Sequence, residues 1–309
     1  MDTSPHTSDF VTVNDIRLHY LDWGGKGPAL LFLAGLGCSA HIFDQFAPRF
    51  VDRFHVLALT RRGHGQSDYP DAGYDIDTLT EDVRQFMDAL KIEQAILVGH
   101  SMASVELSHF AALHPQRVLK LIYLDAAFDY SSSGFKAVQA KNPLRSFQPP
   151  GANADHYTIE DYIAAIKRAY PGLAVIWNEV MDVEVLHSVK QTPEGKVVDK
   201  MSDAIGKALR DTLDSYSPED STLRVPVLSF FSWQDSAYYL SAEFMSDEQQ
   251  AQVIEFFDTI RTPYLREWIE QYRRTVPHAR IVEIPKGHHY CFIKQADLVF
   301  DEMRKFLLD

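Results

Sequence analysis

Short apolar runs bounded by turn residues recur along the first half of the chain and predict strands that are covered on both faces. These runs are Ala29–Leu33, His55–Leu59, Ala95–Val98 and Val118–Leu124. Near the N-terminus, apolar and polar residues alternate instead across Phe10–Val13 and Ile16–Trp23, with Asn14 and Asp15 between them. This alternation predicts two strands joined by a tight turn.

Segments with apolar residues at helical spacing lie between the strand runs. They occur at Ile42–Phe50, at Leu79–Leu90 and directly after Ala103. Late in the chain, the pattern predicts a strand at Val225–Phe231, a helix at Gln249–Arg274, a strand at Arg280–Ile284 and a helix at Ala296–Leu308. Alternating strands and helices predict an α/β fold with a mostly parallel central sheet and helices on both faces.

The alternation of strands and helices is interrupted in the middle of the chain. Helices are predicted there at Ile159–Ala169, Leu173–Val185 and Ser202–Leu213, with a hairpin around Thr192–Lys196. An interruption of about a hundred residues is too long for a plain connection. We therefore expect a core in two parts, residues 1–126 and 223–309, with a mainly helical insertion at 127–222.

Composition narrows the range of partners. The chain has 309 residues, and its formal net charge of −13 argues against nucleic acid or an anionic membrane surface as a partner. It has no apolar run of about eighteen residues, so no membrane span is expected. The first ten residues (MDTSPHTSDF) have neither a basic nor an apolar region, so no signal peptide is expected.

The chain contains two cysteines, Cys38 and Cys291. Two cysteines form neither a disulfide framework nor a zinc site, so we expect free thiols, a cytoplasmic location and no metal centre.

One strand end carries a candidate nucleophile. Ser101 lies between the apolar run that ends at Gly99 and the helix that follows Ala103. A serine in such a sharp turn projects its hydroxyl from the sheet edge, beside the N–H groups and positive dipole of the helix N-terminus. This setting activates a hydroxyl for attack on a carbonyl. Taken alone, the serine is also compatible with an ordinary helix cap.

The sequence Gly99-His100-Ser101-Met102-Ala103 resembles the G-x-S-x-G nucleophile elbow of the α/β-hydrolases, with alanine in place of the last glycine. Two later strand ends carry Asp235 and His288, in the Ser, Asp, His order of that family. The stretch from Arg62 to Ser67 is similar to the R-G-x-G-x-S turn of lid-bearing esterases. The resemblance implies an α/β-hydrolase fold in which residues 127–222 form a helical cap.

The resemblance also implies roles for these residues. Ser101 would be the nucleophile, His288 the general base and Asp235 the carboxylate that orients the base. The backbone N–H groups of Leu36 and Met102 would bind the oxyanion. No cofactor is expected, and the substrate-binding residues stay unknown.

Two further positions depart from the family pattern. The loop after the third strand usually begins His-Gly, but here it begins Ala34-Gly35, so the hydrogen bonds of that histidine are missing. The residue two positions before Arg62 is usually aspartate, but here it is Thr60. We interpret Thr60 as a structural change outside the site.

Several residues have a rival interpretation. His289 directly follows His288, and Asp125 is an alternative to Asp235, because some α/β-hydrolases take their acid from the strand end after the elbow helix. Arg62 is expected in a buried ion pair. A bond between Cys38 and Cys291 is not expected.

These features together predict a serine hydrolase of the carboxylesterase type that acts on a small-molecule ester. Serine in the elbow argues against dehalogenases and epoxide hydrolases, which use aspartate. One alternative is an aminopeptidase, amidase or carbon–carbon hydrolase on the same triad. In an aminopeptidase, Glu179, Asp182 and Glu184 would hold the substrate amine. Another is a receptor that keeps the fold without turnover. The oligomeric state is left open.

Overall fold

The computed structural model describes residues 5–149 and 154–309. The first four residues of the stretch considered for a signal peptide lie outside this range. Within it, eight strands form one sheet in the order β1-β2-β4-β3-β5-β6-β9-β10. The strands are β1 (Thr7–Val13), β2 (Ile16–Gly24), β3 (Ala29–Leu33), β4 (His55–Leu59), β5 (Ala95–His100), β6 (Val118–Leu124), β9 (Val227–Gln234) and β10 (Arg280–Gly287).

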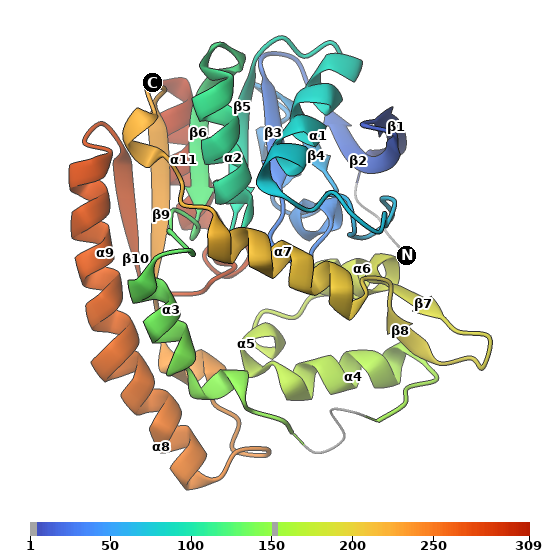
Figure 1. The fold of residues 1–309 in the computed structure, drawn as a ribbon, viewed down its shortest axis with the longest axis vertical. Coiled ribbons are helices and arrows are strands. Elements are labelled where there is room, and N and C mark those ends of the chain that lie inside the picture. The colour runs from blue at the N-terminus through green and yellow to red at the C-terminus, as the bar shows by residue number, and fades with distance from the viewer. Residues whose placement is uncertain (1–4, 150–153) are drawn as a thin grey trace.

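The pairing in this sheet confirms the predicted α/β architecture. The strands from β4 to β10 pair in parallel, whereas β1 and β2 pair antiparallel with each other and β2 pairs antiparallel with β4. The predicted turn between β1 and β2 is present, because Asn14 and Asp15 both adopt positive φ angles of 49° and 61°. Every parallel strand from β3 to β10 therefore ends at the same edge of the sheet (Figure 1).

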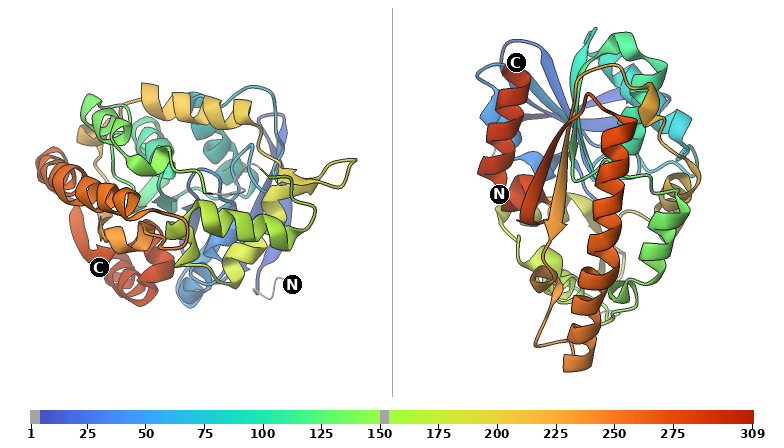
Figure 2. Two further views of the ribbon diagram at one scale, coloured as in Figure 1. Left: turned by 90° about the horizontal axis from the view of Figure 1, so that it is seen from below. Right: turned by 90° about the vertical axis from the view of Figure 1, so that its left-hand side faces the viewer.

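Helices cover both faces of the sheet, and each face has its own apolar core. One face is covered by α1 (Ile76–Ala89), α2 (Ala103–Leu113) and α9 (Thr262–Thr275). The other is covered by α10 (Cys291–Lys294), α11 (Ala296–Leu308) and two 3₁₀ turns. Figure 2 shows α9 and α11 on opposite sides of the sheet.

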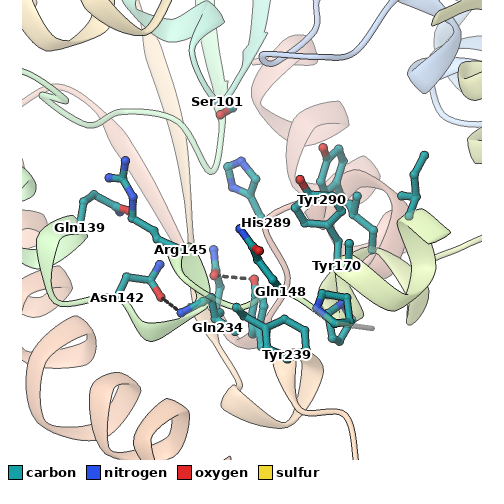
Figure 3. Close-up of a pocket in the computed structure, with 18 of the residues that line it drawn as sticks. Ser101, Gln139, Asn142, Arg145, Gln148, Tyr170, Gln234, Tyr239, His289 and Tyr290 are labelled. Carbon is teal, nitrogen blue, oxygen red and sulfur yellow. Dashed lines mark hydrogen bonds between the residues drawn. The ribbon is translucent and has the colours of Figure 1, made fainter. Parts of the chain in front are cut away.

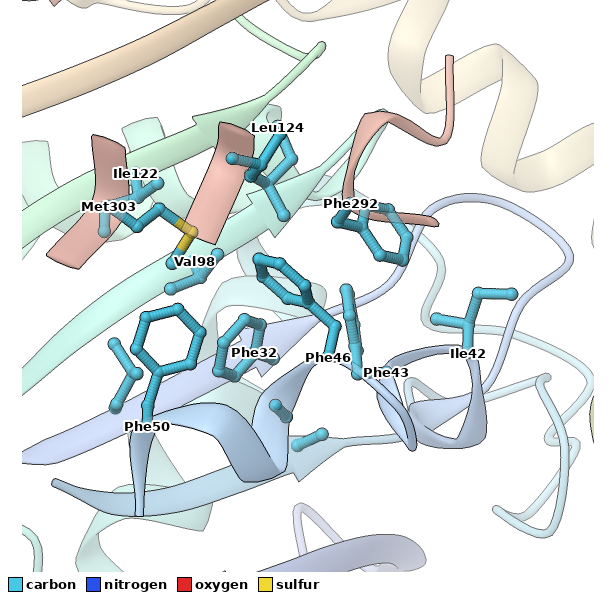
Figure 4. Packing of buried hydrophobic residues seen from close by; sticks show 14 of the residues in the cluster. Phe32, Ile42, Phe43, Phe46, Phe50, Val98, Ile122, Leu124, Phe292 and Met303 are labelled. Atoms are coloured by element: carbon cyan, nitrogen blue, oxygen red, sulfur yellow. The ribbon is translucent and has the colours of Figure 1, made fainter. Parts of the chain in front are cut away.

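The helix expected at Ile42–Phe50 is two separate 3₁₀ turns, η1 (Ala40–Phe43) and η2 (Ala47–Phe50). Pro48, in the first turn of η2, cannot donate the backbone hydrogen bond that would join the two turns into one helix. The apolar pattern was nevertheless informative, since Phe43, Phe46 and Phe50 pack against Phe32 in the core (Figure 4).

Residues between β6 and β9 form a separate layer beyond the carboxyl ends of the strands (Figure 1). This layer contains α3 (Ser133–Ala140), α4 (Ile159–Ala169), α5 (Pro171–Ala174), α6 (Glu179–Ser188), the strands β7 (Val189–Gln191) and β8 (Val197–Asp199), and α7 (Asp203–Ser215). The helix predicted at Leu173–Val185 is broken. Asn178 accepts hydrogen bonds from the N–H groups of Val180 and Met181 and so starts α6 as a new helix.

The predicted helix at Gln249–Arg274 is continuous but irregular. It consists of α8 (Asp247–Phe256), a π-helical turn η7 (Phe257–Arg261) and α9. Its first half extends past the end of the sheet and lies beside the inserted layer (Figure 1). None of the helices in the described ranges is long and apolar enough to cross a lipid bilayer.

A buried carboxylate joins the inserted layer to the core. Glu184 of α6 accepts hydrogen bonds from the N–H and the hydroxyl of Ser39, each at 2.7 Å, and from Ser188 at 3.1 Å. Burial raises the pKa of this carboxyl. Further along, Ile205 and Leu209 of α7 pack with Met102, so the insertion contacts the core beside Ser101.

Two buried histidines should make stability depend on pH. Burial lowers the pKa of His19 and of His64 to about 3, since a charged imidazolium is poorly solvated inside the protein. Between pH 6.5 and about 3, the unfolded chain therefore binds protons at these positions that the folded protein does not. Their contribution to stability is complete above pH 6.5 and is lost progressively as pH falls toward 3.

We therefore predict that the free energy of unfolding falls between pH 6 and pH 4, as measured by urea denaturation. The variant His64→Gln should show a slope shallower by about 1 kcal/mol per pH unit, because one titrating group has been removed. Parallel slopes for wild type and variant would contradict the burial argument for His64.

Candidate active site

The turn at Ser101 is strained in the manner of a nucleophile elbow. Ser101 has a φ of 54°, in the left-handed region that a non-glycine residue rarely adopts. It stands between β5 and α2, and a Cβ on Gly99 would come within 3.2 Å of the backbone of Ala103. The glycine therefore lets the strand and the helix meet at this sharp angle, which turns the serine out of the sheet.

A buried carboxylate lies at the neighbouring strand end. Asp125 directly follows β6, has a φ of 50°, and is 1% exposed. Its Oδ2 accepts a hydrogen bond from Nδ1 of His289 at 2.9 Å. Ser232 N–H donates to Oδ1 at 2.7 Å, and the Gln234 side-chain amide donates to Oδ2 at 3.1 Å. The carboxylate is thus held from three sides by residues of β9 and of the loop after β10.

The other nitrogen of His289 is available for chemistry. In residues 5–149 and 154–309, no group hydrogen-bonds to its Nε2, and the side chain is about one-third exposed at 32%. His100 donates from its Nε2 to the backbone carbonyl of His289 at 3.1 Å, which fixes the chain at this point. Figure 3 shows the imidazole of His289 and the hydroxyl of Ser101 facing the same space.

The structure does not bring Asp235 and His288 together as expected. Asp235 caps the 3₁₀ turn η6 (Ser236–Tyr239) by accepting a hydrogen bond from Ala237 N–H at 2.9 Å. His288 is 1% exposed, with Nε2 2.8 Å from the Gly172 carbonyl and Nδ1 accepting from Tyr290 N–H at 3.0 Å. Burial lowers the pKa of His288 to about 4. Both of its ring nitrogens therefore have structural partners.

The two strand ends explain this difference. The sequence predicted strands ending at Phe231 and Ile284, but β9 continues to Gln234 and β10 to Gly287, with a register shift between Ile284 and Gly287. This irregularity lies directly before His288 and His289. A spacing rule cannot detect such an irregularity, although Asp125 stood in the sequence directly after a well-defined strand.

Gln234 links the carboxylate to a second layer of residues. Its amide nitrogen donates to Asp125, and its Oε1 accepts a hydrogen bond from the Tyr239 hydroxyl at 2.7 Å, drawn as a dashed line in Figure 3. Tyr239 also stacks on the ring of His288, with the ring centroids 6.2 Å apart. His288 therefore lies in the wall that supports Asp125.

The loop after β3 approaches Ser101 closely. A Cβ on Gly35 would lie 2.9 Å from Cβ of Ser101 and 3.0 Å from Nδ1 of His100. In the described part of the chain, the backbone N–H groups of Leu36 and Met102 have no hydrogen-bond acceptor. Two free amides that flank the serine are available to bind a developing negative charge.

Arg61 holds the loop after β3, in which Ala34 stands where the α/β-hydrolases usually have histidine. Arg61 Nη2 donates to the carbonyl of Ala34 at 2.9 Å, and its Nε donates to the buried carboxylate of Glu106. The predicted buried ion pair of Arg62 is confirmed, since it contacts Asp82 through two hydrogen bonds of 2.6 Å. Two neighbouring arginines thus anchor the loops that follow β3 and β4, both on the same side of β5.

A cavity of about 1170 Å³ opens between the sheet edge and the inserted layer. Ser101, Asp125 and His289 all contribute to its wall, and Figure 3 shows the labelled side chains around it. Apolar surface comes from aromatic residues of the insertion and of the long helix, among them Phe128, Phe135, Tyr170 and Phe257. A serine at positive φ, a buried carboxylate and an imidazole therefore share the wall of one large, mainly apolar cavity.

A sequence profile of the α/β hydrolase fold matches residues 28–169. Among solved structures, the crystal structure of E-2-(acetamidomethylene)succinate hydrolase aligns with a TM-score of 0.75 and 21% identity, covering 98% of this chain and all of the other. The chain has the α/β-hydrolase fold. At this level of identity, the structural likeness establishes the fold alone.

Curated relatives match over shorter stretches. A 2-(acetamidomethylene)succinate hydrolase of Mesorhizobium japonicum is 32% identical over 117 residues, 38% of this chain and 42% of the relative. A 3-oxoadipate enol-lactonase of Acinetobacter baylyi is 34% identical over 123 residues, 40% of this chain and 46% of the relative. The chain therefore matches less than half the length of either relative.

The two cysteines are poor candidates for a nucleophile. Both are buried and free, which confirms that they are not bonded to each other. The Cys38 thiol lies 3.5 Å from the Tyr290 hydroxyl. Burial, together with the nearby Glu184 carboxylate, raises the pKa of Cys38 to about 12, so it stays protonated at neutral pH.

Another group of side chains was not found from the sequence. The ligand atoms of His6, His41 and Asp44 lie within 4.8 Å of one another. This is a set that a metal ion could use, but His41 Nδ1 is already 2.9 Å from Asp44 Oδ2, and His187 stacks on His41. None of the three lines the Ser101 cavity. His6 lies far from His41 and Asp44 in the sequence, so the three residues form no recognisable metal-binding motif.

The close approach of Gly35 to Ser101 yields a prediction. Gly35→Ala should lower kcat by roughly 10- to 100-fold, because the added methyl must displace Ser101 or His100. The measurement is steady-state kinetics, with circular dichroism to establish folding.

Gly206→Ala is the matched control, because a Cβ there meets the end of the flexible Arg210 side chain at 3.3 Å. It should leave kcat within twofold. A folded Gly35→Ala enzyme with wild-type kcat would show that the loop does not constrain the serine.

Proposed function

We propose that this α/β-hydrolase cleaves carboxylic esters through an acyl-enzyme intermediate, with Ser101 as nucleophile, His289 as general base and Asp125 as the orienting carboxylate. This proposal replaces Asp235 and His288 in the roles that the sequence pattern implied. The observation that carries it is the 2.9 Å hydrogen bond between His289 Nδ1 and the buried Asp125, in the same cavity as a serine held at positive φ.

The reaction follows from these contacts. Ser101 Oγ attacks the ester carbonyl carbon while His289 Nε2 takes the hydroxyl proton, and Asp125 stabilises the imidazolium that results. The oxyanion of the tetrahedral intermediate accepts hydrogen bonds from the N–H groups of Leu36 and Met102. The intermediate then collapses, and His289 gives its proton to the departing alcohol.

Water completes the cycle by the same path. His289 removes a proton from a water molecule, whose oxygen attacks the acyl carbon of the Ser101 ester. A second tetrahedral intermediate forms with its oxyanion in the same place, and it collapses to release the carboxylic acid and the Ser101 hydroxyl. Residues 127–222 act as a cap that keeps bulk water away from the acyl-enzyme, since they supply much of the cavity wall.

Two relatives support hydrolysis as a class, since one is named a 2-(acetamidomethylene)succinate hydrolase and the other a 3-oxoadipate enol-lactonase. The aminopeptidase alternative has less support. Glu184 is saturated by Ser39, Asp182 accepts a hydrogen bond from Trp177 at 2.7 Å, and neither of them nor Glu179 lines the cavity.

The adjacent histidines provide the sharpest test of the assignment. His289→Gln should lower kcat for p-nitrophenyl butyrate by roughly 10⁴-fold or more, because the serine loses its base. His288→Gln should retain activity within about tenfold, since its amide can still donate to the Gly172 carbonyl. The measurement is steady-state hydrolysis at pH 8, with melting temperatures recorded for both variants.

Retained activity in a folded His289→Gln enzyme, together with its loss in His288→Gln, would return the role of base to His288. Equal losses of kcat in folded His289→Gln and His288→Gln would also contradict the assignment, because His288 is assigned a supporting role and only His289 is assigned as the base.

A further inference from the structure

Arg261 enters the cavity from an irregular part of a long helix. It is the last residue of the π-helical turn Phe257–Arg261, which separates α8 from α9. A π turn widens the helix locally and redirects side chains, and such turns are frequent at functional sites. Phe257 and Arg261 both line the Ser101 cavity, as do Tyr264 and Leu265 from the next turn. The π turn therefore directs the Arg261 side chain into the Ser101 cavity.

This guanidinium has no counter-ion. Within residues 5–149 and 154–309, no carboxylate lies within 4.0 Å of Arg261. The carboxylates that line the cavity already have partners. Asp125 accepts a hydrogen bond from His289, and Asp155 pairs with Lys196 at 2.7 Å. Asp199 accepts a hydrogen bond from Tyr162. The residues at 150–153 are Pro, Gly, Ala and Asn, and none of these has an acidic side chain.

The surroundings of Arg261 suit a ligand. The side chain is partly buried, with Cζ 5.4 Å from the centre of the Phe257 ring. Its positive charge also acts on Tyr239, where it opposes the rise in pKa that burial causes. Tyr239 is hydrogen-bonded to Gln234, which contacts Asp125. Arg261 thus lines the same cavity as Tyr239.

A second unpaired arginine faces the same cavity. Arg145 follows α3 in the 3₁₀ turn η4 (Pro143–Arg145), is exposed, and lines the cavity near Gln139 and Asn142 (Figure 3). No carboxylate of the described residues pairs with it either. Two uncompensated arginines in one cavity are unusual in a chain whose net charge is −13.

We propose that Arg261 binds a carboxylate group of the substrate, so that the preferred substrates are esters whose acyl part carries a second, free carboxylate. The inference rests on the proposed ester hydrolysis and extends it to a substrate class. A planar guanidinium donates two parallel hydrogen bonds to a carboxylate, and the adjacent aromatic ring excludes water from the pair. Arg145 adds positive charge at the rim and attracts the anion.

A carboxylate fits this site better than a phosphate. Phosphate sites commonly use several free backbone N–H groups at the start of a helix. Here the helix continues through η7 into α9, and the N–H of Thr262 is already bonded to the Phe257 carbonyl. The donors at this site are therefore the N–H groups of the Arg261 guanidinium and not free backbone N–H groups.

The test compares two matched esters, mono-p-nitrophenyl glutarate, which carries a free carboxylate, and p-nitrophenyl butyrate, which is neutral. Arg261→Met should lower kcat/KM for the glutarate ester by roughly 10- to 100-fold, mainly through KM, and leave the butyrate ester within about twofold. Arg266→Met is the control, because Arg266 lies on the same helix over Trp233 and does not line the cavity. It should leave the ratio of the two kcat/KM values unchanged.

Binding supplies a readout that does not need turnover. Calorimetry with glutarate and with inorganic phosphate, on wild type and on Arg261→Met, should show glutarate binding that the variant weakens by a similar factor. Tighter binding of phosphate than of glutarate would overturn the choice of carboxylate.

The two proposals fail in different ways. If wild type hydrolyses the butyrate ester and Arg261→Met leaves the glutarate-to-butyrate ratio unchanged, the carboxylate site is wrong and ester hydrolysis stands. If neither ester is hydrolysed while glutarate binding depends on Arg261, the proposed function is wrong and the carboxylate site stands.

Discussion

The site depends on one buried carboxylate. Asp125 is almost inaccessible to solvent, and an unpaired charge there would be strongly destabilising. It is compensated by three donors from different parts of the chain, namely His289, Ser232 and Gln234. These contacts join the ends of β6, β9 and β10, so satisfying this charge also fixes the position of the imidazole. That constraint therefore sets where the imidazole stands in the cavity wall.

The loops around Ser101 are held by a second set of buried charges. Arg61 bridges Glu106 and the carbonyl of Ala34, and Glu184 of the insertion holds Ser39. Thr60, which stands where the family has aspartate, accepts a hydrogen bond from Ala40 N–H at 3.0 Å and contacts His19. Its role is structural, as the sequence suggested. The loop that approaches Ser101 is therefore fixed without the usual histidine, and the insertion is attached to the same loop.

Much of the fold could be predicted from the sequence, because strands such as Ala29–Leu33 and Val118–Leu124 are short apolar runs with clear ends. The elbow at Ser101 was found for the same reason. The choice between adjacent or competing residues was not predictable, since the apolar pattern does not show which of His288 and His289 contacts Asp125. Arg261 also escaped detection, because its direction depends on a π-helical turn that leaves no mark in the apolar pattern.

The central claim is that Asp125, acting through His289, activates Ser101. Mass spectrometry after treatment with a fluorophosphonate tests it most directly, applied to wild type and to the folded variants Asp125→Asn and Asp235→Asn. The account predicts modification of Ser101 in wild type and in Asp235→Asn at similar rates, and a loss of rate by roughly 10⁴-fold in Asp125→Asn, because the histidine would present the wrong tautomer. Rapid labelling of Ser101 in Asp125→Asn with slow labelling in Asp235→Asn would contradict the account, as would modification of a residue other than Ser101.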